Sequence, residues 1–361
     1  MRLSDRYIFG ELFLPFLIGT LSVLMMLIGN TLFAYLARML QEKWPVGVVL
    51  RALVLNIPTV LVLTLPVATA LAASLATNRI ARDGEVTVLR GAGVPLFRIF
   101  LPIVAFGCLI GIGNLYISDR VVPWAWKEQQ NIEMLLYSLP KDPIQNSVAF
   151  KVENYAFYIG TAQRVGSNRL RLTKVQIVRA PEAPDEYAEI TTAREAEYFE
   201  DVWTLHDVVV HRYNRDGTTL FDARSKKAVL NLRVNFSQVI APPLREDQLA
   251  FSDLTTRAKD ARRLGQTNDA LRYETERWFK LSLPAMCLVF ALCAPPLALR
   301  FSRAGSFTGV LLSIIIVFIG WNTLLLMKYV ALGGLVPPLA AAWTTNIIFT
   351  LLGLWLLRVQ D

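Results

Sequence analysis

Charged residues are missing from six stretches of the chain, three near its beginning and three near its end. Each stretch is rich in apolar residues and about as long as the ~20 residues that a helix needs to cross the hydrocarbon core of a membrane. The pattern therefore predicts six transmembrane helices in two packets of three. The stretches lie between Glu11 and Arg38, Arg51 and Arg79, Arg98 and Asp119, Lys280 and Arg300, Arg303 and Lys328, and Lys328 and Arg358.

Between the two packets, apolar and polar residues alternate in short segments, which is typical of strands with one buried face. Many short strands separated by turn signals predict a sandwich, jelly roll or partly open barrel. Its apolar face, to which Phe157 and Val209 are expected to belong, either closes into an ordinary core or stays open as a groove for apolar ligands. The predicted strands are 147–152, 155–160, 170–178, 189–198, 202–213, 219–223 and 228–236.

Two helices are predicted between these strands and the fourth span. Ser252 is a candidate N-cap for the first, and Gly265 can end it. The second begins near residue 268 and runs into the span. The residues of the first helix that share an apolar face are Leu254, Ala258, Ala261 and Leu264.

These patterns predict an α+β membrane protein with six transmembrane helices, arranged 3+3, and an inserted antiparallel β-jelly-roll-like domain. The predicted parts are 1–118 with spans one to three, 119–280 with the β-domain and its flanking helices, and 281–361 with spans four to six.

Composition agrees with a membrane protein, because 54% of the residues are hydrophobic and the mean hydropathy is +0.41. The net charge of +8 is uneven: residues 119–280 carry 24 Lys and Arg against 23 Asp and Glu, and the rest carries 13 against 6. A nucleic-acid binder would concentrate positive charge on its soluble part. The three cysteines, Cys108, Cys287 and Cys293, all lie in predicted spans, so the insert has no disulfide framework.

The loop 79–98 carries four arginines against two acidic residues, and the positive-inside rule places it in the cytoplasm together with both termini. The insert, the loop 38–51 and the loop after Lys328 then lie on the opposite side. Arg38, Lys43 and Arg51 run against the rule in that outward loop and require another explanation.

The sequence contains little that predicts catalysis. The only histidines, His206 and His211, lie in a predicted strand, and no nucleophile–His–Asp arrangement, metal cluster or cofactor motif is apparent. The dipeptide Gly-Lys never occurs, so the chain has no P-loop. No ionisable residue sits in the middle of a span, which argues against a proton or sodium path. If the chain transports a substrate, a separate ATPase should supply the energy.

The loop 79–98 is where such an ATPase could dock. Residues 83–90 can form a short helix that ends at Gly91-Ala92-Gly93, with Val86 and Leu89 on one face beside Arg82 or Arg90. The same residues are equally compatible with a charged turn between spans two and three, and spacing alone leaves both interpretations open.

Several fragments in this order resemble one family over essentially the whole length. They are the opening Asp5-Arg6-Tyr7-Ile8 with Glu11 and Pro15, the segment Glu85-Val86-Thr87-Val88-Leu89-Arg90-Gly91-Ala92-Gly93, the Tyr273, Lys280 and Pro284 entry to span four, and Pro295-Pro296-Leu297. The chain resembles the YjgP/YjgQ family, the LptF/LptG permeases of the lipopolysaccharide exporter. Leu36-Ala37-Arg38-Met39-Leu40 resembles the LptF version of span one, whereas the opening Asp-Arg-Tyr is shared with LptG-type chains.

The resemblance implies an inner-membrane ABC transporter permease with cytoplasmic termini and a periplasmic β-domain. It implies as partners a cytosolic ATPase dimer, a second permease that is a paralogue or a copy, and a periplasmic jelly-roll bridge protein that receives lipopolysaccharide. It also implies two sites. The ATPase-coupling residues would be Arg82, Asp83, Glu85, Val86, Leu89 and Arg90, and the residues that contact lipid phosphates would be Arg38, Lys43 and Lys328.

Three other classes compete with this interpretation. A mechanotransmitting ABC permease also has a periplasmic domain, but usually four spans with the domain after the first. A membrane scaffold or chaperone would bind only protein through the insert. A membrane enzyme acting on lipid precursors would need the acid/base or metal cluster that the sequence lacks.

Overall fold

The computed structural model describes residues 3–42, 44–138, 148–152, 155–164, 170–179, 188–199, 202–213, 219–231, 245–301 and 306–360. They form two compact units. The helical unit comprises Met1–Gln129 and Leu244–Asp361, and the β-unit comprises Gln130–Pro243.

Six helices of the described chain are long and apolar enough to cross a membrane, three before the β-unit and three after it. The first three are α1 (Leu3–Glu42), α2 (Val46–Arg82) and α4 (Leu96–Tyr116), and α4 continues through the π-helical turn η1 (Ile117–Val121) into α5 (Val122–Ser138). The last three are α8 (Thr267–Arg300), α9 (Ser306–Leu332) and α10 (Pro338–Gln360). The predicted 3+3 arrangement is confirmed.

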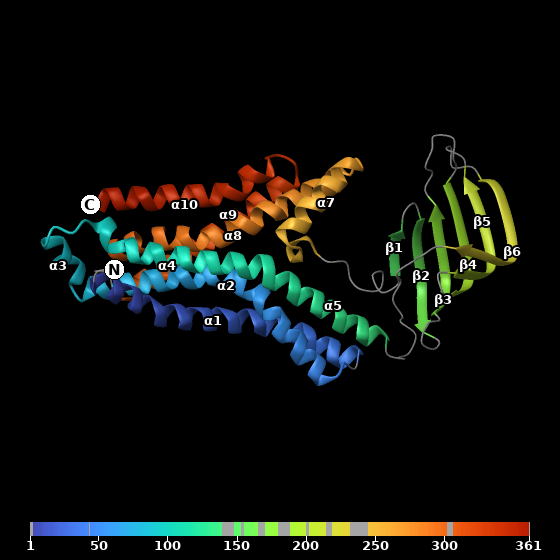
Figure 1. Cartoon of the computed structure of the whole chain (residues 1–361), viewed down its shortest axis with the longest axis horizontal. Helices are drawn as coiled ribbons and strands as arrows, with labels where there is room; N and C mark the ends of the chain where they lie inside the picture. Colours follow the sequence, from blue (N-terminus) through green and yellow to red (C-terminus); the bar gives the residue numbers. More distant parts are fainter. Residues whose placement is uncertain are drawn as a thin grey trace. The chain divides into compact units, whose positions relative to one another are not determined.

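Helix α8 lies at the centre of the helical unit. Its most apolar window is 67% buried, whereas the corresponding window of α1 is 11% buried, so α1 offers most of its surface to lipid or to another chain. Figure 1 shows the start of α1, the short helix α3 (Glu85–Gly91) and the end of α10 at one end of this unit, and α7 (Phe251–Arg263) at the other. The two ends can therefore be considered separately.

Helix α7 and the short 3₁₀ helix η2 (Glu246–Gln248) belong to the helical unit, although the sequence boundaries 119–280 grouped them with the β-domain. The reason is the apolar face of α7, since Leu254, Ala258 and Ala261 are buried as predicted and α7 packs along α8. Two local expectations differ. The N-cap is Ala250 rather than Ser252, and Leu264 is exposed because the helix ends at Arg263.

The β-unit holds one antiparallel sheet of six described strands in the order of the sequence, a meander. The α+β class is thereby confirmed, although the described strands show none of the Greek-key crossovers that define a jelly roll. The predicted strand 219–223 and the described start of the predicted strand 228–236 are joined in one strand, because residues between them, such as Arg224 and Lys227, continue the pairing with β5. Residues 232–236 lie outside the described part of the chain. The strands are β1 (Val148–Val152), β2 (Tyr155–Arg164), β3 (Leu170–Arg179), β4 (Ala188–Phe199), β5 (Val202–Tyr213) and β6 (Thr219–Asn231).

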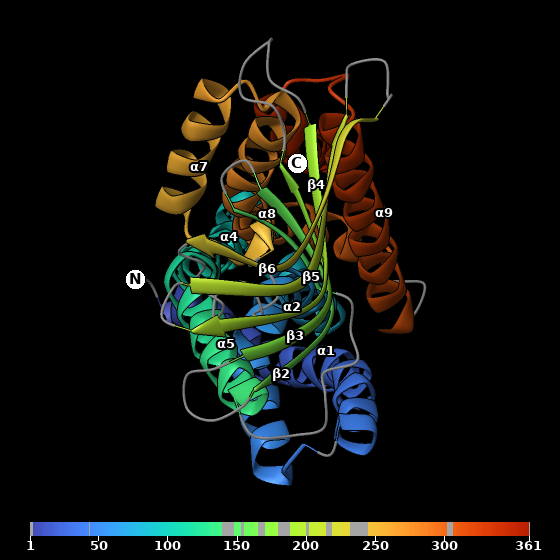
Figure 2. The same cartoon turned by 90° about the vertical axis from the view of Figure 1, so that its right-hand side faces the viewer.

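One face of this sheet is apolar and buried. Trp203 stacks on Phe157 with ring centroids 5.0 Å apart, and Tyr198 meets Trp203 edge-on at 5.3 Å. Figure 2 shows that the strands curve strongly, and among the described residues no pairing joins β1 to β6, so the sheet is open at its edges. The buried residues are Phe157, Ile159, Leu172, Val175, Ile177, Ala193, Ala196, Trp203, Leu205 and Val208.

A crease runs across the sheet and shifts the alternation of its side chains. The pairing skips one residue on each of five strands, namely Gly160, Lys174, Arg194, Asp207 and Lys226. Two of these residues have a left-handed backbone, with φ of 52° at Lys174 and 53° at Asp207. The crease corrects one expectation about the apolar face. Phe157 is buried as predicted, but beyond Asp207 the buried residue is Val208, and Val209 is only partly buried.

Candidate functional site

The loop between spans two and three contains the predicted short helix, α3. Gly84 and Gly93 flank it with φ of 77° and 81°, a left-handed conformation that glycine adopts without steric cost. The amide of Val94 donates to the carbonyl of Leu89 at 3.1 Å and closes the second turn. Two glycine turns therefore fold the loop back so that α3 packs on the end of the bundle.

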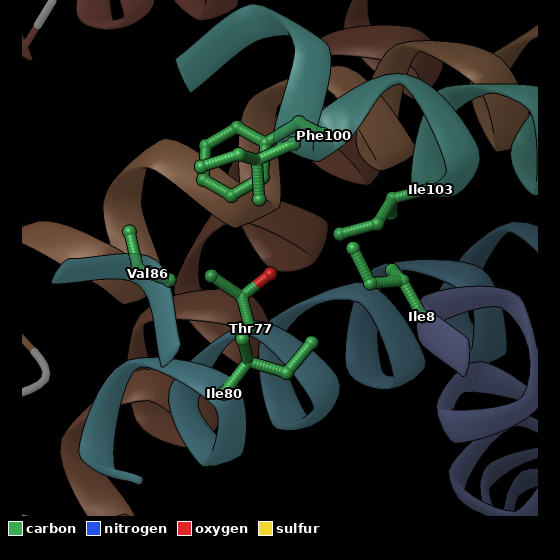
Figure 3. A pocket seen from close by; sticks show the side chains of 7 residues that line it. Ile8, Thr77, Ile80, Val86, Phe100 and Ile103 are labelled. Carbon is green, nitrogen blue, oxygen red and sulfur yellow. The ribbon is translucent and has the colours of Figure 1, made fainter. Parts of the chain in front are cut away.

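Val86 anchors α3 in this end of the bundle. Its side chain is 4% exposed and enters a small apolar pocket between α1, α2 and α4, with Leu89 packed beside it. Figure 3 shows Val86 pointing toward the other side chains that line the pocket, which are Ile8, Thr77, Ile80, Ile99, Phe100 and Ile103. Val86 thus faces the bundle and holds α3 in place, while its predicted part in coupling to an ATPase stays a prediction.

The outward face of α3 consists of other residues. Arg90 is exposed on α3, and Arg82 at the end of α2 and Asp83 just after it are exposed in the turn that precedes α3. Val88 is 72% exposed on this face, and the sequence analysis missed it. The signal was available, because Val86 and Leu89 are three residues apart on one side of a helix and Val88 therefore lies off that side.

Polar contacts tie the first turns of α1 to this loop. The hydroxyl of Tyr7 donates a hydrogen bond to Oε1 of Glu85 at 3.0 Å. Asp5 pairs with Arg98 of α4 at 2.9 Å, and Glu11 pairs with Arg79 of α2. The side chain of Glu85 is therefore directed toward α1, and its hydrogen bond with Tyr7 helps to fix α3 against α1.

The other end of the helical unit carries Lys328, near the end of α9. Its side chain is 30% exposed, and its Nζ lies 2.5 Å from Oε1 of Glu276 on α8. Of the other two predicted lipid-contacting residues, Arg38 belongs to α1 but its side chain lies outside the described part of the chain, and Lys43 lies outside the described residues altogether. Arg51, which also ran against the positive-inside rule, forms an ion pair with Glu128 of α5.

The sequence analysis also missed Glu276. It is separated from Lys328 by more than fifty residues, so no local spacing could reveal the pair. The structure brings them together because α8 and α9 pack against each other.

Two packets of candidate spans, an inserted antiparallel sheet and a short helix folded onto one end of the bundle define a multi-pass membrane protein with an inserted β-domain. Over residues 6–359 the chain matches the family described as lipopolysaccharide export system permease LptF/LptG, and it belongs to that family. Proteins of this family are transport subunits rather than enzymes in their own right. No curated protein matches the chain.

Proposed function

We propose that this chain is a permease subunit of an ABC transporter that extracts lipopolysaccharide from the inner membrane and passes it to a periplasmic bridge protein. A separate cytosolic ATPase dimer supplies the energy, and a second permease of the same family completes the membrane part. The observation that carries the proposal is the family match, which spans both packets of helices and the β-unit.

The physical demand of the task fits the parts of this chain. Exposing acyl chains to water costs about 0.8 kcal/mol for each methylene, so a lipid with several long chains needs continuous apolar shelter. The strongly apolar spans are surfaces of that kind. The missing P-loop agrees with energy supplied by a partner.

Each end of the helical unit then has its own role. At the cytoplasmic end, the exposed residues Arg82, Asp83, Val88 and Arg90 contact the ATPase, while Val86, Leu89 and Glu85 hold α3 in place. At the periplasmic end, Lys328, with Arg38 and Lys43, binds the phosphates of the lipid headgroup through charge-assisted hydrogen bonds. Both termini are cytoplasmic and the β-unit is periplasmic.

Site-specific photocrosslinking tests this function. A photoreactive amino acid replaces Tyr329, which is 71% exposed beside Lys328, or Val359, which is 58% exposed near the opposite end of the bundle. We expect a lipopolysaccharide adduct at position 329 and little at 359, with an ATPase co-purifying with the permease. Adducts to protein alone at position 329 would instead favour a scaffold, and equal lipid adducts at both positions would count against a headgroup site.

A further inference from the structure

The ammonium group of Lys328 already forms an ion pair with a carboxylate of the same chain. Glu276 Oε1 lies 2.5 Å from Lys328 Nζ, so the two groups are in direct charge-assisted contact. The two side chains differ in access, since that of Lys328 is 30% exposed and that of Glu276 is 14% exposed. A ligand can therefore approach the ammonium from its open side, while the carboxylate stays on the protein side.

Glu276 has a second ammonium within reach. Lys280 follows it by one helical turn on α8, the spacing at which two helical side chains meet. Lys280 is 8% exposed, and Glu276 is among the carboxylates that act on it. If the Glu276 carboxylate leaves Lys328, it can therefore pair with Lys280 instead.

The same region is crowded with negative charge. Asp119, Asp247 and Asp253 also interact electrostatically with Lys280. Asp247 and Glu246 interact in the same way with Glu276. Asp119 additionally accepts a hydrogen bond from the amide of Phe251 at 2.8 Å, which ties the end of the third span to the start of α7. An anion arriving at Lys328 thus meets repulsion from this group, and it displaces Glu276 only if its own contacts with the ammonium are stronger than those of the carboxylate.

We propose that Glu276 is an exchangeable internal counter-ion of Lys328. It holds the lysine when no substrate is bound, and a phosphate group of a lipid headgroup displaces it toward Lys280. This inference rests on the proposed function and adds a selectivity element to the same site. A phosphate brings more negative charge and more acceptor oxygens than a carboxylate, whereas an unphosphorylated headgroup brings nothing that displaces Glu276. When the lipid leaves, Glu276 returns and Lys328 is not left unpaired.

Binding of defined lipids to the purified full-length permease, together with its co-purifying subunits, tests the exchange. The probes are bisphosphorylated lipid A and the same lipid after dephosphorylation. Glu276→Gln removes the competing charge, so we expect affinity for the bisphosphorylated lipid to rise by about tenfold, equivalent to ~1.4 kcal/mol. Affinity for the dephosphorylated lipid should stay unchanged. An unchanged or weakened affinity for the bisphosphorylated lipid would overturn the proposal.

Glu274→Gln is the matched control. Glu274 lies on the same helix, is similarly buried at 16% exposed and also pairs with a basic residue, Arg262, at 2.7 Å, but it does not contact Lys328. We expect no change in phosphate-dependent binding for this variant. A gain equal to that of Glu276→Gln would mean that the effect is general electrostatics, and it would overturn the exchange.

Two further arms separate this proposal from the proposed function. Lys328→Gln should abolish the preference for the phosphorylated lipid; if the preference persists, the headgroup contact itself fails. If Lys328→Gln loses the preference but Glu276→Gln gains no affinity, only the exchange fails.

Inorganic phosphate should not compete at equal concentration, and full competition would assign the site to free phosphate rather than to a lipid. If Glu276→Gln does not fold, Glu276→Asp, with its shorter reach, should give a smaller gain, and no gain in that variant would overturn the exchange.

Discussion

Two glycines of α4 decide how closely this span approaches the central helix α8. A Cβ added at Gly107 would lie 2.8 Å from the carbonyl oxygen of Cys287, and one added at Gly111 would lie 3.1 Å from the carbonyl oxygen of Pro284. The two glycines are four residues apart and therefore share one face of the helix. This is the small-residue spacing that lets membrane helices pack backbone against backbone.

Gly107→Ala should consequently destabilise the helical unit. The added methyl group forces α4 away from α8, and overpacking of this kind costs about 1–3 kcal/mol. We expect a lower midpoint of thermal unfolding for the purified protein in detergent. Gly113→Ala is the control, since a Cβ at Gly113 meets nothing within 4 Å. Equal midpoints for the two variants would show that this close approach does not limit stability.

At the scale of elements, α3 has one buried side and one exposed side, and these should respond differently to the same substitution. Val86→Asp places a charge in an apolar pocket, so we expect a lower unfolding midpoint and loss of the ATPase from the purified complex. Val88→Asp changes only the exposed side. It should keep the midpoint of the unchanged protein but reduce ATPase co-purification. Normal ATPase recovery with Val88→Asp would remove this face from the coupling contact.

The same element shows what the sequence could and could not predict. Glycine signals were sufficient to predict a short helix after span two, but not which of its sides faces the bundle. That choice depends on the pocket formed by Ile8, Ile99 and Phe100, which come from distant parts of the chain. Likewise, the periodicity predicted the strands, but the left-handed residue Asp207 is not a glycine, so the shift that buries Val208 left no local signal.

At the scale of the whole molecule, the bundle has two chemically different ends. The polar contacts of Asp5, Tyr7 and Glu11 gather at the end that carries α3. The pair of Glu276 and Lys328 lies near the opposite end, where α8 begins and α9 finishes. In the proposed mechanism, energy enters at one end and substrate binds at the other, so the helices that connect the two ends must transmit movement. This division of labour requires the two ends to face different compartments.

Cysteine labelling tests that requirement directly. Val88→Cys marks α3, and Leu335→Cys marks the turn between α9 and α10, where Leu335 is 80% exposed. Both are made in a Cys108→Ser background, because Cys108 is exposed whereas Cys287 and Cys293 are buried. With a membrane-impermeant maleimide on intact spheroplasts, the Leu335→Cys variant should label at once and the Val88→Cys variant only after lysis. The reverse order would invert the orientation, place α3 in the periplasm and make docking of a cytosolic ATPase there impossible.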